Sequence, residues 1–444
     1  MKTPSGAWLE AWTPEDSTFW QQTGSKIAWR TLTITTISLV LSFATWFMIS
    51  AIVVRLPQIG FKFDTMQLFW LAAMPGLAGG TLRIVHTFLI PIFGTRSVIT
   101  FSTLLKLIPC IGIGLAVMNP DTPFWIFMLL AFSAGFGGGD FSSYMPSTSV
   151  FFPKRLQGTA LGIQAGIGNF GVSLTQFVTP WIIGIAAFGA SQTLVKGGVT
   201  SSVWLQNAAF WYVPLLVIMG IVGWLYLRSV PVRASFREQL DIFKNKHTWF
   251  CTVTYVMTFG SFAGFAAAFP LLIKTLYGSF PDAPDPLTYA FLGPLVGSLS
   301  RVAAGPFADK YGGGIITHLV GLGLIVSVAF MSFAGLLAPT SLDQFPLFVG
   351  VMLFIFLLTG IGNASTFRQF PIIFSHSARQ GAGVIGWTAA IAAYGPFIFA
   401  TLIGTMITSY GSPILFFIGI GVYYVIATGI NWWYYTRKGC EKPS

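Results

Sequence analysis

The sequence predicts an all-α membrane protein with twelve transmembrane helices in two six-helix halves. Three observations predict it: the apolar composition, the recurrence of apolar runs, and a similarity between the two halves of the chain. Of the 444 residues, 54% are hydrophobic and only 8% are charged, whereas soluble domains carry roughly 25% charged residues. This small number of charged residues cannot cover the surface of a water-soluble protein of this size. We therefore expect one membrane domain.

Apolar runs of about 20 residues, the length that crosses a bilayer as a helix, recur along the whole chain. The predicted spans are residues 31–54, 66–90, 97–117, 124–148, 159–187, 204–228, 249–274, 287–307, 315–337, 345–366, 383–407 and 412–434. An even number of spans leaves both chain ends on one side of the membrane.

Lys and Arg are distributed unevenly among the connections between these spans. Seventeen lie in the alternate connections that include the two termini, four lie in the others, and Arg83, Lys106 and Arg301 lie within spans. Basic connections stay in the cytoplasm, which predicts a multi-pass protein of the inner (plasma) membrane with both termini cytoplasmic. The net charge of +11 therefore orients helices and does not indicate a nucleic-acid partner.

The longest of these connections, residues 229–248, divides the chain into two six-helix parts, 1–228 and 249–444. Their sequences are similar: residues 79–83 (GGTLR) in the second span match 297–301 (GSLSR) in the eighth. Residues 137–141 (GGGDF) in the fourth span likewise resemble 362–367 (GNASTF) in the tenth. Repeated halves with a site between them are typical of transporters, and neither a channel nor a receptor needs this plan.

Arg83 and Arg301 are the strongest indication of function. Each lies well inside an apolar span, where a charge costs at least about 2.5–3.5 kcal/mol, and neither has an acidic residue one turn away on its own helix. Their matching positions predict guanidinium groups on opposite walls of one cavity, each able to bind a planar oxyanion in bidentate fashion. The alternatives are a structural ion pair or snorkelling, and snorkelling suits Lys106 better.

Glycines are dense in the fifth span, where most of them fit close helix packing. Asn169, among them, is an amide in hydrocarbon that needs partners and can donate to an anion. No Lys-Ser/Thr pair follows these glycines, which excludes a phosphate-binding loop.

The three cysteines and four histidines are scattered, so we expect no metal site, no cofactor and no enzyme activity.

Residues 162–171 (GIQAGIGNFG) resemble the nitrate signature of the nitrate/nitrite porter family (NarK-type) within the major facilitator superfamily. Residues 12–16 (WTPED), 151–154 (FFPK) and 258–262 (TFGSF) also match the family, and the resemblance covers nearly the whole chain. It implies the major facilitator fold and secondary active transport of nitrate and nitrite by alternating access, as antiport or proton symport. We also expect a monomer in the lipid bilayer.

The resemblance assigns further site residues. The family's paired substrate arginines fall on Arg83 and Arg301, and its substrate-contacting tyrosine falls on Tyr255. The glycines and asparagine of the signature include Gly166, Gly168 and Asn169. The aromatic residues above and below the anion fall on Phe141, Phe259 and Phe367, which the residues alone would predict to face lipid or the core.

The sequence also departs from the family pattern. Gln164 and Asp140 stand where relatives usually have asparagine, and the second signature, residues 386–397 (GWTAAIAAYGPF), has fewer glycines than usual. Asp140 is a candidate for proton coupling, with His86 as a relay, because an arriving anion would draw a proton onto a nearby carboxylate. The alternative role of Asp140 is a structural ion pair with an arginine or with Lys106.

The alternative function of the protein is that of a porter for another small monovalent anion, such as formate or a carboxylate.

Overall fold

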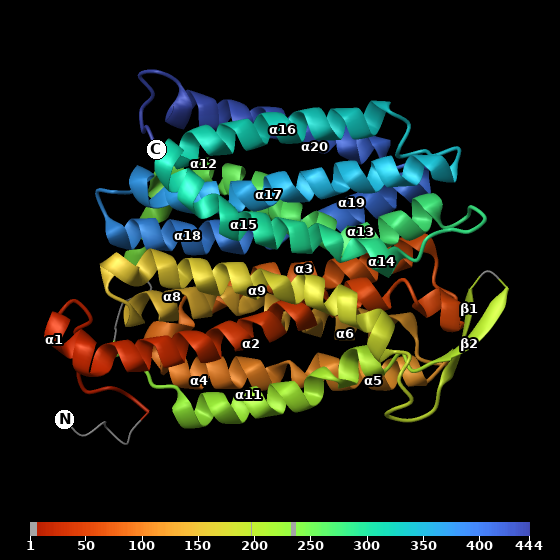
Figure 1. Ribbon diagram of the computed structural model, residues 1–444, viewed down its shortest axis with the longest axis horizontal. Coiled ribbons are helices and arrows are strands. Elements are labelled where there is room, and N and C mark those ends of the chain that lie inside the picture. The colour runs from red at the N-terminus through yellow and green to blue at the C-terminus, as the bar shows by residue number, and fades with distance from the viewer. Residues whose placement is uncertain (1–6, 197, 232–236) are drawn as a thin grey trace.

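The computed structural model describes residues 7–196, 198–231 and 237–444. The long helices lie side by side in one bundle, and both termini lie at the same end of it, which we call the terminal end (Figure 1). Lys2 and Arg233, which contributed to the count of basic residues, lie outside the described residues. We call the helices before and after the connection 229–248 the first and second halves.

The first half begins with α1 (Ser17–Phe19) and η1 (Trp20–Gly24), which lead directly into the first long helix. Its remaining helices are α2 (Ser25–Ile52), η2 (Leu56–Ile59), α3 (Thr65–His86), α4 (Leu89–Leu105), α5 (Leu107–Met118), α6 (Phe124–Ala134), α7 (Phe136–Gly139), α8 (Phe141–Phe151), α9 (Lys154–Ile182), α10 (Asn207–Phe210) and α11 (Tyr212–Tyr226).

The second half follows the same plan with a short helix before the first span. Its helices are η3 (Arg237–Lys244), α12 (Lys246–Tyr255), η4 (Val256–Gly260), α13 (Ser261–Tyr277), α14 (Pro286–Ala290), α15 (Leu292–Tyr311), α16 (Gly313–Phe333), η5 (Leu342–Gln344), α17 (Phe345–Ile373), α18 (Ala378–Ala392), α19 (Gly395–Tyr410), α20 (Ile414–Asn431) and η6 (Trp432–Thr436). Each predicted span coincides with helix in the described residues, so the all-α bundle is confirmed.

Within the described residues, ten helical segments are long and apolar enough to cross a membrane. The other two predicted spans coincide with α9 and with α14 and α15. These segments are less apolar for a visible reason: α15 carries Arg301, Asp309 and Lys310, and α9 begins with two basic residues and is rich in glycine.

The fourth span is broken into α6, α7 and α8 around its run of three glycines. A Cβ at Gly138 would lie 2.7 Å from the Trp46 ring and 2.8 Å from the Cα of Gly79. Only glycine therefore lets α7 approach α2 and α3 this closely. The close approach brings the Gly138 carbonyl within reach of side chains on α3.

One element was not expected from the sequence. Strand β1 (Gln192–Lys196) pairs antiparallel with β2 (Val199–Val203), with Gln192 opposite Val203. The hairpin projects from the end of the bundle opposite the terminal end (Figure 1). Its segments are rich in threonine and valine, which favour strands, and they are too short for the periodicity analysis to separate from a loop.

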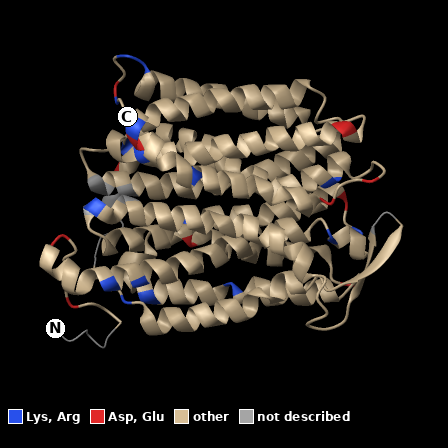
Figure 2. Ribbon diagram, in the orientation of Figure 1, with Lys and Arg blue, Asp and Glu red and all other residues tan. Residues whose placement is uncertain are grey.

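Lys and Arg gather toward the terminal end of the bundle (Figure 2), in agreement with the charge bias of the sequence. At the opposite end, two contacts join the halves. The Arg55 guanidinium pairs with Asp285 at 2.6 Å, and Lys274 Nζ donates to the carbonyl of Val54 at 2.7 Å. The assignment of the terminal end to the cytoplasm stays a prediction.

Candidate functional site

The two arginines within spans are both buried, Arg83 on α3 and Arg301 on α15. Arg83 Nε donates to the carbonyl of Gly138, and Nη1 donates to the carbonyl of Ala389, each at 2.8 Å. Because Ala389 is on α18, Arg83 joins the first half to the second. Its remaining nitrogen, Nη2, has no hydrogen-bond partner in the described structure.

Arg301 is held less tightly. Neither of its terminal nitrogens, Nη1 and Nη2, has a hydrogen-bond partner among the described residues. A buried donor without a partner costs about 1–3 kcal/mol, and a charged one costs more. Arg83 and Arg301 therefore offer three buried nitrogens that lack an acceptor.

Four aromatic rings form a continuous cluster beside these arginines. The Phe141 centroid lies 6.5 Å from the centroids of both Phe259 and Phe367. The Tyr255 ring stacks on Phe259 at 5.5 Å and on Phe367 at 4.9 Å, with interplanar angles of 5° and 17°. Tyr255 is fully buried and its hydroxyl has no partner in the part of the chain described here.

The two halves repeat one pair of residues. The Arg83 guanidinium lies 4.9 Å from the Phe141 centroid, and the Arg301 guanidinium lies 5.0 Å from the Phe367 centroid. Each arginine thus lies over the phenylalanine that ends the matching repeated segment of its own half, in a cation–π geometry. We call the two arginines and the four rings together the arginine–aromatic site.

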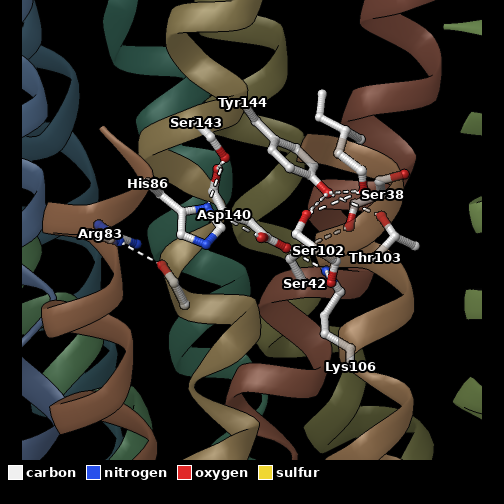
Figure 3. A network of polar contacts seen from close by, with 12 residues as sticks. Ser38, Ser42, Arg83, His86, Ser102, Thr103, Lys106, Asp140, Ser143 and Tyr144 are labelled. Carbon is white, nitrogen blue, oxygen red and sulfur yellow. Dashed lines mark hydrogen bonds and ion pairs between the residues drawn. The ribbon is translucent and has the colours of Figure 1, made fainter. Parts of the chain in front are cut away.

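A second polar network lies next to this site (Figure 3). Asp140 Oδ2 accepts hydrogen bonds from Lys106 Nζ and, at 2.6 Å, from Ser42 Oγ. Lys106 also donates to the carbonyl of Ser102 at 2.9 Å. His86 Nδ1 lies 3.8 Å from Asp140 Oδ1 and 3.0 Å from Ser143 Oγ, as Figure 3 also shows.

The prediction that Lys106 snorkels is wrong. Its side chain is fully buried, and so is that of Asp140. An unpaired buried ammonium group is costly, and the carboxylate provides the partner that a lipid interface would otherwise supply. Among the described residues, Asp140 forms no ion pair with Arg83 or Arg301. Its charge is therefore balanced by Lys106, and the charges of the two arginines are not balanced by it.

Comparison with known proteins identifies the family. The family model of the Major Facilitator Superfamily matches residues 35–384. The chain belongs to the Major Facilitator Superfamily. Within it, the chain is 59% identical to the "Probable nitrate/nitrite antiporter NarK2" of Thermus thermophilus, over 100% of both chains. It is 36% identical to the "Nitrate/nitrite transporter NarU" of Escherichia coli K12, over 97% of this chain and 96% of the relative. The chain is therefore a NarK-type member of the superfamily and not an enzyme.

The fold agrees with this assignment. A solved bacterial homologue of the human lysosomal transporter Spinster, in an inward-facing and unoccupied conformation, aligns with a TM-score of 0.68 at 13% identity. The alignment covers 91% of this chain and 96% of that one. At this identity the likeness extends to the fold alone.

The glycines and the asparagine of the signature have different surroundings in this NarK-type chain. A Cβ at Gly166 would lie 2.7 Å from a methyl of Val302, and one at Gly168 would lie 2.7 Å from a methyl of Leu39. Both glycines thus lie at close helix contacts. Asn169 is buried, and both its amide oxygen and its amide nitrogen lack partners in the described structure.

Two further buried residues were not selected from the sequence. Asn363 on α17 is fully buried, and neither atom of its amide has a partner among the described residues. An amide within an apolar span was the signal that selected Asn169, and it could have selected Asn363. The Trp46 ring lies 5.2 Å from the Arg83 guanidinium and donates to the carbonyl of Pro75 at 2.7 Å. No sequence signal distinguishes Trp46 from a core residue.

Proposed function

We propose that this protein transports nitrate and nitrite across the inner membrane by alternating access and binds the anion between Arg83 and Arg301. The observation that carries the proposal is the presence of three buried guanidinium nitrogens, from both halves and beside stacked rings, that have no acceptor among the described residues. The printed names of the relatives support nitrate and nitrite over formate or another carboxylate.

The chemistry of the arginine–aromatic site supports a planar monovalent oxyanion. Arginine nitrogens and the Tyr255 hydroxyl donate, and nitrate offers three oxygen acceptors in one plane. Phe259 and Phe367 provide flat apolar surfaces against which such an ion can lie. A cation would be repelled by two guanidinium groups, and a neutral solute would leave their charges unbalanced.

Contacts between the halves support alternating access. Arg83 reaches the carbonyl of Ala389 across the interface, and the Arg55–Asp285 pair crosses it at the end opposite the terminal end. Opening that end requires the Arg55–Asp285 pair to break. An anion that bridges Arg83 and Arg301 attracts the two halves to each other. This attraction offsets the contact between the halves that is lost when the Arg55–Asp285 pair breaks.

We propose exchange of nitrate for nitrite as the coupling mode. An empty site leaves two buried guanidinium charges without a counter-ion, and enclosing them on both sides is costly. The protein therefore changes sides readily only with an anion bound, which makes exchange obligatory. The pairing of Asp140 with Lys106 supports this mode, because the carboxylate already has a counter-ion.

Proton-coupled uptake is the second candidate, and one observation favours it. Asp140 Oδ1 has no hydrogen-bond partner in the described structure, and His86 Nδ1 is 3.8 Å away. A proton on this oxygen or on His86 would change the charge beside Phe141 when an anion binds. Under this candidate, Asp140→Asn abolishes uptake driven by a pH gradient and leaves exchange intact.

Proteoliposomes separate these modes. With nitrite inside and nitrate outside, exchange predicts rapid nitrate entry without a pH gradient and almost none when internal nitrite is omitted. Gradient-driven entry into nitrite-free liposomes, lost in Asp140→Asn, would instead establish proton coupling. Formate that competes as well as nitrite would overturn the proposed selectivity.

The proposed orientation has both termini in the cytoplasm. A cysteine introduced at Asp343, at the end opposite the termini, should react with an impermeant reagent applied to whole cells. A cysteine at Lys244 should react only after the cells are opened. Labelling of the Lys244 position in intact cells would reverse the topology.

A further inference from the structure

A cavity of about 820 Å³ lies between α4 and α11 in the first half, and none of its wall residues belongs to the arginine–aromatic site. Its walls are almost entirely apolar and include Phe93, Phe101, Ile221 and Trp224. The exposed fractions of Phe93, Phe101 and Trp224 are 55%, 68% and 53%. The cavity therefore opens sideways, onto the outer surface of a membrane-spanning bundle.

Two arginines lie beside this cavity, toward the terminal end. The Arg96 guanidinium lies 4.2 Å from the centroid of Trp224, a wall residue, and its Nε has no partner in the described structure. Arg228 Nη1 donates to the carbonyls of Leu225, another wall residue, and Leu227, at 3.1 and 2.9 Å. Both guanidinium groups thus lie at one edge of an apolar cavity.

One residue of the cavity wall is a threonine with an enclosed hydroxyl group. Thr100 lines the cavity and is 6% exposed, and its hydroxyl forms no hydrogen bond within the described residues. A ligand for this cavity must therefore present long apolar surface to the walls and anionic oxygens to the edge.

We propose that the cavity binds one anionic phospholipid, with an acyl chain between α4 and α11 and the phosphate paired with Arg96 and Arg228. Basic pockets between transmembrane helices recognise anionic headgroups, and guanidinium groups bind phosphate in bidentate fashion. A zwitterionic lipid lacks the net charge that the two arginines favour. A small free anion lacks the chain that would fill the cavity.

The lipid would also contact the network of Asp140. His86 lines the inner part of the cavity, and its Nδ1 is 3.8 Å from Asp140 Oδ1. An acyl chain against the His86 ring keeps this network enclosed. The inference is independent of the transport proposal, because it depends only on α4, α11 and their edge residues.

Native mass spectrometry of the delipidated full-length protein, titrated with phosphatidylglycerol or phosphatidylcholine, tests the proposal. The wild type should bind one phosphatidylglycerol in preference to phosphatidylcholine. The double variant Arg96→Gln/Arg228→Gln should bind phosphatidylglycerol roughly thirtyfold more weakly, with phosphatidylcholine unchanged. Arg437→Gln is the matched control, because Arg437 also stacks on a tryptophan, Trp433, at 4.0 Å, but in the second half. It should bind like the wild type.

Two further experiments test whether the acyl chain of the lipid occupies the cavity. Ser97 is an exposed residue of the cavity wall, and Ser97→Trp should block phosphatidylglycerol while the protein keeps its thermal stability. Glycerol phosphate, which has the headgroup charge without a chain, should not displace the lipid. Equal lipid affinity in the double variant and the wild type, full binding by Ser97→Trp, or displacement by glycerol phosphate would each overturn the proposal.

Discussion

The two halves of the molecule hold equivalent arginines in different ways. Arg83 is fully buried, donates to two carbonyls, and has three aromatic rings within about 5 Å of its guanidinium. Arg301 has one such ring and two terminal nitrogens without partners in the described structure. A repeated sequence can therefore supply one arginine that hydrogen bonds hold in place and one whose donors are available to a ligand.

The residues beside the two arginines also differ between the halves. Beside Phe141 the first half has Asp140, paired with Lys106, whereas beside Phe367 the second half has Thr366, whose hydroxyl donates to the carbonyl of Gly362 at 2.8 Å. The first half thus contains a buried ion pair at a position where the second half has a neutral side chain.

The largest effect concerns the buried ion pair of the first half. Lys106→Met leaves the Asp140 carboxylate buried without its counter-ion, which should destabilise the protein by about 3–5 kcal/mol. The double variant Lys106→Met/Asp140→Asn removes both charges and should recover most of that loss. Thermal unfolding in detergent measures both. A double variant as unstable as the single one would show that the pair does not account for the effect.

Next is the fixed arginine. Arg83→Lys removes the donors to Gly138 and Ala389, so the protein without anion should lose about 1–3 kcal/mol of stability for each carbonyl left unpaired. Nitrate affinity should also fall roughly ten- to a hundredfold with the loss of one charge-assisted hydrogen bond. Calorimetric titration and thermal unfolding report the two effects. An unchanged melting temperature would contradict the fixed role of Arg83.

The free arginine should affect binding alone. Arg301→Lys keeps the charge and loses the fork of donors, so nitrate affinity should fall by the same ten- to hundredfold factor. Its stability without anion should stay within about 0.5 kcal/mol of the wild type, since the terminal nitrogens have no hydrogen-bond partner to lose in the described part of the chain. Arg437→Lys, outside the site, is the control and should change neither quantity. Near-normal nitrate affinity in Arg301→Lys would remove this residue from the site.

The smallest effect lies outside the membrane, at the terminal end of the second half. Hydrogen bonds from Lys246, at 2.7 Å, and His247, at 3.1 Å, lower the pKa of Glu441 below its ordinary value. A lowered carboxylate pKa adds stability that is complete above the unfolded-state value of about 4.3 and is lost as the pH falls through the folded-state value. Glu441→Gln should therefore melt slightly earlier at pH 7, and this difference from the wild type should shrink as the pH falls through the folded-state pKa. A difference that grows on acidification would contradict this assignment.

Much of the fold and the centre of the site could be predicted from the sequence. Most spans are long apolar runs, and a charge within a span is costly, so Arg83 and Arg301 could be identified without any relative. Phe141, Phe259 and Phe367 could not, because a phenylalanine in a transmembrane helix carries no signal of its own; only the resemblance to a family assigned them.

Lys106 shows what the sequence could not decide. It offered Lys106 as one possible partner of Asp140, beside an arginine, and it also favoured snorkelling for Lys106. Because the two residues are 34 positions apart, no spacing along one helix selects the ion pair over these alternatives. Only packing brings α4 and the break between α7 and α8 together. The β1–β2 hairpin was missed because five-residue strands are too short to show periodicity against a polar connection.

The central claim is that Arg83 and Arg301 bind one anion between them, and a double-mutant cycle tests it most directly. Nitrate affinities of the wild type, Arg83→Lys, Arg301→Lys and the double variant give the coupling between the two positions. If both guanidinium groups hold the same ion, the double variant should lose less than the sum of the single losses, by at least about 0.5 kcal/mol. Losses that add within about 0.3 kcal/mol would show two independent residues and would contradict a shared site.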